Sequence, residues 1–507
     1  MTLGTYSYDS MKTSQNFWIE QIKQLKQINP AKLSKKRRLT YDVLLDYFQR
    51  KLDFSDVCIC TEDLSPTLGI QAQLPVIFSE YEFSSAKDII QYFSLLKSIG
   101  PYYDGICQFQ REKARQQCFI GKSTCGRIIA QCQAFLNGKA ISSNLLSTSF
   151  SHRISHCDFL SSKEKEQYTK QNNQIIKDTV FPAYETLIHT LTDLMEDGSC
   201  KNENGLYYLK KGKAYYEYLV QDYTGCNKSI PEIKAEIQNT LLADIQTLQK
   251  LLQNHPELET KMAQALPETS APQIMKELQS KISRDFPAMN SLPFQLKYVD
   301  APLQKFLSPA FYISPPLDDP DNHVIYINPG KKENLYTLLA HEGIPGHMYQ
   351  NAFFSKTNPN PIRFLLECGG YSEGWALYTE LFSYSYQLKD PNLAKLFQIN
   401  ARFSLALYCL CDIGIHYEGW TRKDLEKFLR TYQLSDRKIS DQMFQAVLED
   451  PANYLKYYVG YLEIINLQKT MQKTLGKDFS LKEFHRDLLT IGPAGFTVLQ
   501  KWMLPQK

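Results

Sequence analysis

The chain has 507 residues, of which 43% are hydrophobic, 22% charged and 12% aromatic. This is the composition of a globular protein with a large core, and it excludes a disordered, collagen-like or disulfide-framework protein. The net charge of +3 is too small for this size to predict nucleic acid or an anionic membrane as the main partner, so we expect a small or neutral one.

The amino terminus, MTLGTYSYDSMKTSQNF, lacks the basic start and continuous apolar stretch of a secretory leader. Taken literally, this start predicts a cytoplasmic protein, and twelve cysteines without a CxxC pair agree with a reducing compartment. An exported or lipid-anchored protein whose leader has been removed is the alternative. The apolar residues 403–415 are too short to span a membrane and include Asp412, so we expect no transmembrane segment.

Helical periodicity dominates the first half of the chain. Residues 84–100 place Ile89, Ile90, Phe93 and Leu96 on one broad face behind a serine cap. Residues 230–286 repeat an amphipathic pattern three times, with proline at the starts of the repeats. These patterns predict a mainly α fold.

The region with the clearest strand pattern lies at residues 294–328, which contain the runs QLKYVD, AFYISPP and VIYIN. The last two runs flank the turn sequence LDDPDNH, which predicts a β-hairpin. A helix, LYTLLAHEG, follows almost at once. We therefore expect a small hairpin or sheet beside whatever site that helix carries.

A candidate metal site begins in this helix, where LLAHEGIPGHMYQ contains His341, Glu342 and His347. In the zinc motif HExxH the histidines are four residues apart and share one face of a helix. Here they are six residues apart, which rotates the second histidine by about 120° on an unbroken helix. Pro345 has no amide hydrogen and Gly343 and Gly346 tolerate unusual dihedral angles, so we predict a break that lets His347 return to the site. The alternative is that GIPG ends the helix and the histidines only cap or pack.

The third ligand should come from the next helix, YSEGWALYTELF, in which Glu373 and Glu380 share one face. Two histidines and one carboxylate form a His₂Glu zinc set that leaves one coordination position open. We assign Glu373 as the ligand, and Glu380 as the carboxylate that orients a ligating histidine. A solvated position at the end of its helix is the alternative for Glu380.

These motifs resemble those of known zinc peptidases. EGWALYTE resembles the EGFAxYxE stretch of the aminopeptidase N family, and dipeptidyl peptidases of the third class also lengthen HExxH. The whole chain is more similar to the bacterial "domain of unknown function 885" family, whose hallmarks are HE(A/G)xPGHxxQ and EGWAxYxE. The resemblance is strong over residues 295–500 and loose before them. It implies a two-lobed, helical, metallopeptidase-like fold, and members of this family often carry an exported-lipoprotein leader.

The ligands predict a reaction. Zinc held by His341, His347 and Glu373 would lower the pKa of a bound water from about 15.7 toward about 7, and it would polarise a carbonyl. Glu342 is the candidate general base for that water. These roles define metal-assisted amide hydrolysis, although the residues alone predict only a zinc hydrolase. The resemblance implies a peptidase acting on oligopeptides.

Further catalytic candidates are donors for the developing oxyanion. Tyr457, in YLKYYVG, resembles a tyrosine that the family keeps at this place, and Arg402 and His416 come from the preceding helix. A core position is the alternative for Tyr457, and a buried polar network with Asp412 is the alternative for the other two.

The strand VIYIN contributes two substrate-binding candidates, Tyr326 and Asn328. We interpret it as an edge strand that pairs with an extended peptide, although a plain sheet edge fits the same pattern. The resulting prediction is a helical lobe at residues 1–290 and a catalytic, metal-binding lobe at residues 291–507, packed as one unit. An inactive metal-containing peptide-binding protein and a zinc amidase acting on a non-peptide substrate are the alternative functions.

Overall fold

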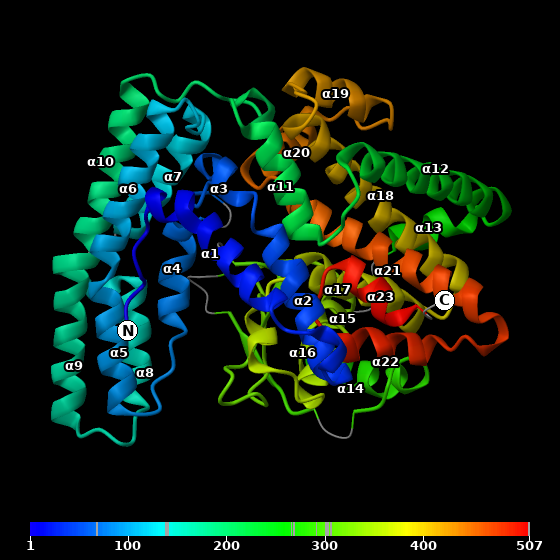
Figure 1. The fold of residues 1–507 in the computed structure, drawn as a ribbon, viewed down its shortest axis with the longest axis horizontal. Coiled ribbons are helices and arrows are strands. Elements are labelled where there is room, and N and C mark those ends of the chain that lie inside the picture. The colour runs from blue at the N-terminus through cyan, green and yellow to red at the C-terminus, as the bar shows by residue number, and fades with distance from the viewer. Residues whose placement is uncertain are drawn as a thin grey trace. The chain divides into compact units, whose positions relative to one another are not determined.

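The computed structural model describes residues 1–66, 69–136, 141–264, 266, 269–289, 292–299, 304 and 307–504. Helices make up most of it, and one small sheet is present (Figure 1), so the predicted mainly α fold is confirmed. The chain packs into two compact units: unit 1 is Met1–Phe17, Asp53–Tyr216 and Gly414–Pro451, and unit 2 is Trp18–Leu52, Glu217–Ile413 and Ala452–Lys507. The predicted lobe boundary between residues 290 and 291 lies outside the described residues, so that division stays a prediction.

Unit 1 is a set of amphipathic helices in which α10 packs against α6 and α7, and α8 packs against α9. Its helices are α3 (Phe54–Val57), α4 (Ile70–Ser79), α5 (Ala86–Lys97), α6 (Ile99–Arg115), α7 (Lys122–Leu136), α8 (Leu145–Ser155), α9 (Ser162–Ile175), α10 (Phe181–Glu196), α19 (Arg422–Arg430) and α20 (Arg437–Glu449). Three more have residues in both units: α1 (Tyr8–Lys26), α11 (Gly212–Thr224) and α18 (Pro391–His416).

Helix α5 shows how the sequence determines local structure in unit 1. The Asp88 carboxylate accepts hydrogen bonds from the backbone N–H and the hydroxyl of Ser85, at 2.8 and 2.9 Å, and so caps the helix start. Phe93 and Leu96 are buried as predicted. The prediction for Ile90 is wrong, because this side chain is 61% exposed and lies about 100° around the helix from buried Ile89.

Unit 2 holds the sheet and the helices α2 (Lys35–Arg50), α12 (Ile230–Asn254), α13 (Glu257–Ala263), α14 (Ala271–Lys281), α15 (Leu335–Glu342), α16 (His347–Lys356), α17 (Gly369–Gln387), α21 (Asn453–Leu475), α22 (Leu481–Ile491) and α23 (Phe496–Met503). Pro231 and Pro272 lie in the first turns of α12 and α14, and Pro256 directly precedes α13. A missing amide hydrogen costs nothing at a helix start, because no partner awaits it there. The three helices predicted for residues 230–286 are confirmed.

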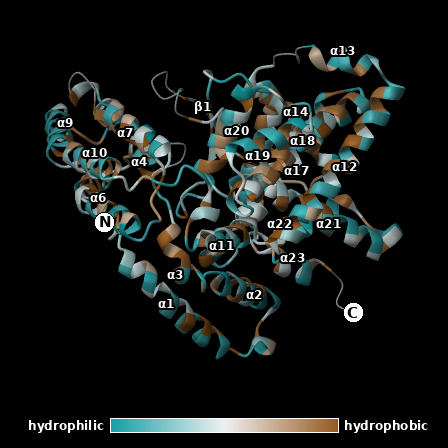
Figure 2. Cartoon of the chain, turned by 90° about the horizontal axis from the view of Figure 1, so that it is seen from above, coloured by the Kyte–Doolittle hydropathy of each residue, from teal (hydrophilic) through white to brown (hydrophobic). Residues whose placement is uncertain are grey.

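Hydropathy follows the packing of these helices. Figure 2 shows hydrophilic and hydrophobic residues along the same helix in α12, whose buried residues include Ile233, Ile237 and Leu241. Unit 2 has a continuous hydrophobic core that includes fully buried Trp375 and Leu339. Among the helices that the structure describes, none has both the length and the apolar character that crossing a membrane requires.

The sheet has three strands, β1 (Gln295–Tyr298), β2 (Ala310–Ile313) and β3 (Val324–Ile327), in the order β1–β3–β2. Strands β2 and β3 pair antiparallel, with Tyr312 opposite Ile325, so the predicted hairpin is confirmed. Strand β1 pairs parallel with the other side of β3. The prediction of VIYIN as an edge strand is therefore wrong, because both of its backbone edges are already paired.

Helices α17 and α21 cross at unusually close range. A Cβ atom on Gly374 would lie 2.4 Å from the backbone carbon of Gly460, and one on Gly460 would lie 2.2 Å from the Gly370 oxygen. Only glycine allows this approach, since real Cβ contacts stay above 3.0 Å. The crossing brings the start of α21, which carries Tyr457, to the helix that carries Glu373.

Candidate metal centre

The two histidines stand on separate helices, as the predicted break requires. His341 and Glu342 end α15, and His347 is the first residue of α16. The backbone N–H groups of Gly343 and Ile344 both donate to the Leu339 oxygen, at 3.0 and 3.2 Å. The Ile344 bond spans five residues and so forms a wider turn than the α-helix, which stops here, and the following residues redirect the chain.

Close packing holds this break in place. A Cβ atom on Gly346 would lie 1.8 Å from the His341 oxygen, so no larger residue fits there. The indole N–H of Trp375 donates to the Pro345 oxygen at 2.9 Å. Trp375 stands two residues after Glu373, so it ties the third ligand's helix to the break. Sequence reasoning missed this role, although a tryptophan beside a ligand motif was a visible signal.

Three ligand atoms converge at this point. One nitrogen of His341, one nitrogen of His347 and one oxygen of Glu373 lie within 4.8 Å of one another. The Glu373 Oε2 atom is 3.3 Å from His347 Nε2 and 3.7 Å from His341 Nε2. Two ligands bonded to one zinc ion at about 2.1 Å in tetrahedral geometry would lie about 3.4 Å apart. The observed distances fit a shared ion.

The charges of the site favour a bound cation. Glu373 Oε2 is buried and forms no hydrogen bond within the described part of the chain. Although burial opposes ionisation of the Glu373 carboxyl, the two histidines hold its pKa well below the usual range. Burial likewise lowers the pKa of His341, yet Glu373 and Glu380 raise it well above its usual value. A cation at this point would satisfy the carboxylate that protein groups leave without a hydrogen bond.

Glu380 lies on the other side of the His341 ring. Its Oε2 atom is 2.9 Å from His341 Nδ1. A hydrogen bond donated by Nδ1 leaves Nε2, the nitrogen that faces Glu373, free to ligate. This is the arrangement in which a carboxylate orients a metal-binding histidine.

Glu342 is held beside the ligands rather than among them. Its Oε1 atom is 3.9 Å from His341 Nε2, and its Oε2 atom accepts a hydrogen bond of 3.0 Å from the backbone N–H of Tyr312 in β2. The strand next to the site is thus β2, an edge of the sheet. Sequence reasoning missed Tyr312, because a backbone donor leaves no signature in residue type.

Tyr457 joins the site through its ring. The Tyr457 and His341 rings are stacked, with centroids 6.3 Å apart and planes inclined by 28°. The close crossing of α17 and α21 supports this position. Of the three predicted oxyanion donors, Tyr457 is the one that the structure brings to a metal ligand.

Arg402 and His416 have other partners. Arg402 makes a two-pronged ion pair with Asp244, with its Nε atom 2.8 Å from Oδ2, and both residues belong to unit 2. His416 belongs to unit 1, where its ring nitrogens lie 3.1 Å from the Leu206 nitrogen and 3.0 Å from the Val447 oxygen. The structural alternative describes both residues better, although the partner of Arg402 is Asp244 and not the expected Asp412.

The two predicted substrate-binding residues, Tyr326 in β3 and Asn328 directly after it, also have other partners. The Asn328 amide nitrogen donates to the Gln304 and Leu307 oxygens, each at 2.9 Å, and its oxygen accepts from Gly330 at 3.0 Å. Asn328 is 2% exposed, so it holds a loop instead of facing a ligand. The Tyr326 ring stacks on Phe311 with centroids 5.0 Å apart.

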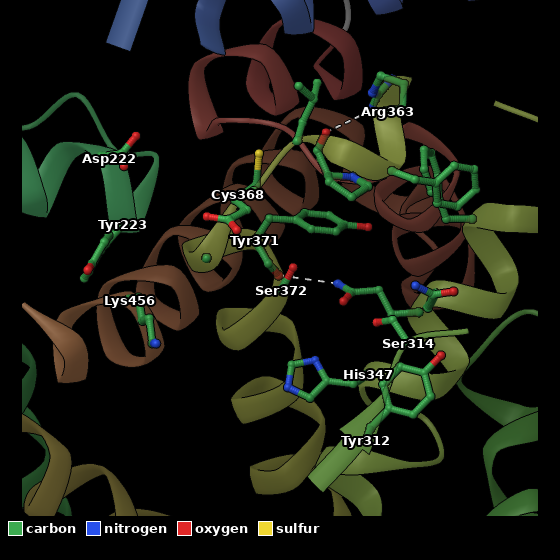
Figure 3. Close-up of a pocket in the computed structure, with 18 residues that line it drawn as sticks. Asp222, Tyr223, Tyr312, Ser314, His347, Arg363, Cys368, Tyr371, Ser372 and Lys456 are labelled. Carbon is green, nitrogen blue, oxygen red and sulfur yellow. Dashed lines mark hydrogen bonds between the residues drawn. The ribbon is translucent and has the colours of Figure 1, made fainter. Parts of the chain in front are cut away.

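A pocket of about 490 Å³ opens next to His347 (Figure 3). Its wall includes Tyr312 of β2, Ser372 of α17 and Lys456 of α21. A substrate in this pocket would therefore lie beside a metal ligand. A volume of this size is typical of sites for small molecules or short chain segments.

Comparison with known proteins gives a family and a fold. The family model described as "Bacterial protein of unknown function (DUF885)" matches residues 1–503. No curated protein matches the chain. A structure described as "putative lipoprotein" from Colwellia psychrerythraea is similar with a TM-score of 0.86 at 19% identity, over 98% of this chain and 91% of that chain. A second structure, described as "a putative lipoprotein of unknown function", is from Shewanella oneidensis. It has a TM-score of 0.69 at 17% identity, over 99% of this chain and 94% of that chain. These likenesses show the fold alone.

Proposed function

The chain belongs to the family of bacterial proteins of unknown function called DUF885, and we propose that it is a zinc-dependent metallopeptidase that hydrolyses amide bonds of oligopeptides. The observation that carries this proposal is the convergence of His341, His347 and Glu373, with the Glu342 carboxylate directly beside them. A hydrolase is favoured over a purely structural metal site, because structural zinc sites are usually closed by four protein ligands.

The residues of the site have separate tasks. Zinc bound there would supply Lewis-acid polarisation of the substrate carbonyl and would make a water molecule more acidic. Glu342 accepts the proton of the attacking water and returns it to the leaving amine, and the Tyr312 N–H keeps its carboxylate in position. Glu380 fixes the His341 ring. Tyr457 donates to the developing oxyanion.

The surroundings of the site support a peptide as the substrate. Strand β2 is an edge of the described sheet and lies against the end of α15 through Tyr312 and Glu342. An extended peptide can add to such an edge by backbone pairing, at positions other than the Tyr312 N–H that Glu342 occupies. The pairing role that the sequence suggested for β3 therefore moves to β2 in this proposal, and the pocket beside His347 receives the side chains.

Glu342→Gln tests the proposal. We expect purified protein to contain about one zinc per chain, and the variant to keep the zinc while turnover of a mixed peptide library falls roughly 10²- to 10⁴-fold. Elemental analysis and mass spectrometry of the peptides measure the two quantities. Glu483→Gln, an exposed carboxylate paired with Arg486, is the matched control and should leave both unchanged.

Two results would contradict the proposal. If the purified protein contained no zinc and also failed to bind added zinc, the three residues would not form a zinc site. Zinc-loaded protein that binds peptides without cleaving them would instead identify a metal-containing peptide-binding protein, and cleavage of non-peptide amides alone would identify an amidase.

A further inference from the structure

Lys456 is an unusual cation in the pocket beside the metal centre. It precedes Tyr457 on α21 and lines the same pocket as His347 (Figure 3). Its ammonium group lies 5.3 Å from the centre of the Tyr457 ring and 6.0 Å from that of Tyr223. Among the described residues, no carboxylate comes within 4.0 Å of its Nζ atom. Two aromatic faces hold this charge, and none of the described carboxylates forms an ion pair with it.

The acidic side chains of the pocket do not compensate Lys456. Asp222 is already paired with Lys51, whose Nζ atom lies 2.8 Å from its Oδ2 atom. Glu367 is exposed, so water solvates its charge. Lys456 is only partly exposed, and a partly buried cation gains more from an entering anion than a fully hydrated one does. The pocket is therefore better prepared for an anion than for an amine.

Two polar residues of the pocket wall are close in the chain to candidate metal ligands. Ser372 directly precedes the ligand Glu373, and Asn351 lies one helical turn after the ligand His347. Both line the pocket with Lys456. A hydroxyl, an amide and an ammonium group can each donate a hydrogen bond to a carboxylate.

From this arrangement we infer that Lys456 binds the C-terminal carboxylate of the peptide, so that the enzyme removes short segments from the carboxyl end of its substrates. This inference rests on the proposed function. In the reaction the scissile C–N bond breaks, the water oxygen bonds to the carbonyl carbon, and the amine of the C-terminal segment leaves with one added proton. A pocket of about 490 Å³ has room for a short segment.

Paired substrates test the inference. One is an N-acetylated peptide with a free C-terminal carboxylate, and the other is the same peptide with a C-terminal amide. We expect zinc-loaded wild-type protein to cleave the free acid with a kcat/KM roughly 10- to 100-fold higher than the amide, since a hydrogen bond to a charged group is worth that factor. Lys456→Met should lose this preference, chiefly through a higher KM, and Lys456→Arg should recover part of it.

Lys473→Met is the matched control, because Lys473 is exposed in the last turn of the same helix. It should keep the preference of the wild type. Equal cleavage of acid and amide, or an unchanged preference in Lys456→Met, would overturn the inference while leaving the peptidase proposal intact. A requirement for a free amino terminus would also overturn it, in favour of amine recognition.

A binding experiment separates this inference from the proposed activity. Calorimetry with the zinc-loaded Glu342→Gln variant compares the affinities of the two peptides without turnover. Tighter binding of the free acid, lost in the Glu342→Gln, Lys456→Met double variant, supports the carboxylate site even if the wild type cleaves nothing. Equal affinities would refute it.

Discussion

His341 in unit 2 and His416 in unit 1 are two imidazoles with little solvent exposure and opposite surroundings. The His341 nitrogens face the carboxylates of Glu380 and Glu373, and these carboxylates raise its pKa. The His416 nitrogens face backbone groups of Leu206 and Val447, and burial lowers its pKa to about 4. The first environment attracts a cation, and the second keeps a neutral ring that joins parts of unit 1. The groups that surround a histidine, and not the residue type itself, decide whether it belongs to a binding site or to the protein core.

Arg402 extends the same comparison within unit 2. Its guanidinium is buried against the Asp244 carboxylate, so its charge is already neutralised. Lys456 lacks such a partner among the described residues and lines a pocket. Of these two cations, the one with an unsatisfied charge is the better candidate for a ligand contact.

After Glu342→Gln, the largest expected effect concerns Tyr457. Tyr457→Phe removes only the hydroxyl, so we expect kcat for peptide hydrolysis to fall roughly 10²- to 10³-fold, as for other lost oxyanion donors. Zinc content and the free energy of unfolding should stay close to those of the wild type. Steady-state kinetics measure the effect.

Tyr458→Phe is the control for this experiment. Tyr458 is the next residue on α21, and its buried hydroxyl has no hydrogen-bond partner among the described residues. Both variants thus remove one tyrosine hydroxyl from α21, but from different sides of the helix. A similar loss of kcat in both would show that Tyr457 acts through packing.

The next effect concerns His416 and acid stability. Its pKa is about 4 in the folded protein and about 6.5 in an unfolded chain. The unfolded state therefore binds a proton first, and the stability that His416 contributes is complete above pH 6.5 and is lost as the pH falls toward 4. The loss amounts to about 3 kcal/mol for this single group.

Urea unfolding at pH 7.5 and pH 4 measures this difference. His416→Gln should be less stable than the wild type at pH 7.5, but it should lose about 3 kcal/mol less on acidification. The comparison between variants is needed because the pKa of His485 in unit 2 is also lowered to about 4. Parallel pH profiles for wild type and variant would show that His416 does not carry this dependence.

The smallest expected effect concerns Glu380. Glu380→Gln keeps the shape of the side chain but weakens its hold on His341 Nδ1, so we expect zinc affinity to fall roughly 10- to 100-fold. Competition with a chelator of known affinity measures it. Glu367→Gln, a change to an exposed carboxylate of the pocket beside His347, should leave the affinity unchanged. If Glu380→Gln also left it unchanged, its contact with His341 would have no role in metal binding.

The sequence predicted those features that depend on neighbouring residues. The break after Glu342 follows from Gly343, Pro345 and Gly346, whose backbone preferences act within one turn. The spacing of Glu373 and Glu380 likewise follows from helix geometry. Local chemistry was therefore enough to identify the residues that meet at the candidate metal centre.

Features that depend on distant residues could not be predicted in this way. Strand β3 has the same alternating pattern as an edge strand, and only its pairing with β1 shows that it is central. Arg402 finds Asp244, 158 positions away in the chain, instead of the nearer Asp412. Tyr312 contributes a backbone N–H, which every residue except proline possesses.

By itself, then, the sequence determined the mainly α fold, the hairpin and the four central residues His341, Glu342, His347 and Glu373. It could do so because helix periodicity, turn chemistry and motif spacing operate over a few residues. The tertiary structure alone decided which strand borders the site, that Tyr457 approaches His341 whereas Arg402 and His416 have other partners, and that Lys456 enters the pocket. Those outcomes depend on how helices and strands distant in the chain pack, which no short stretch of residues encodes.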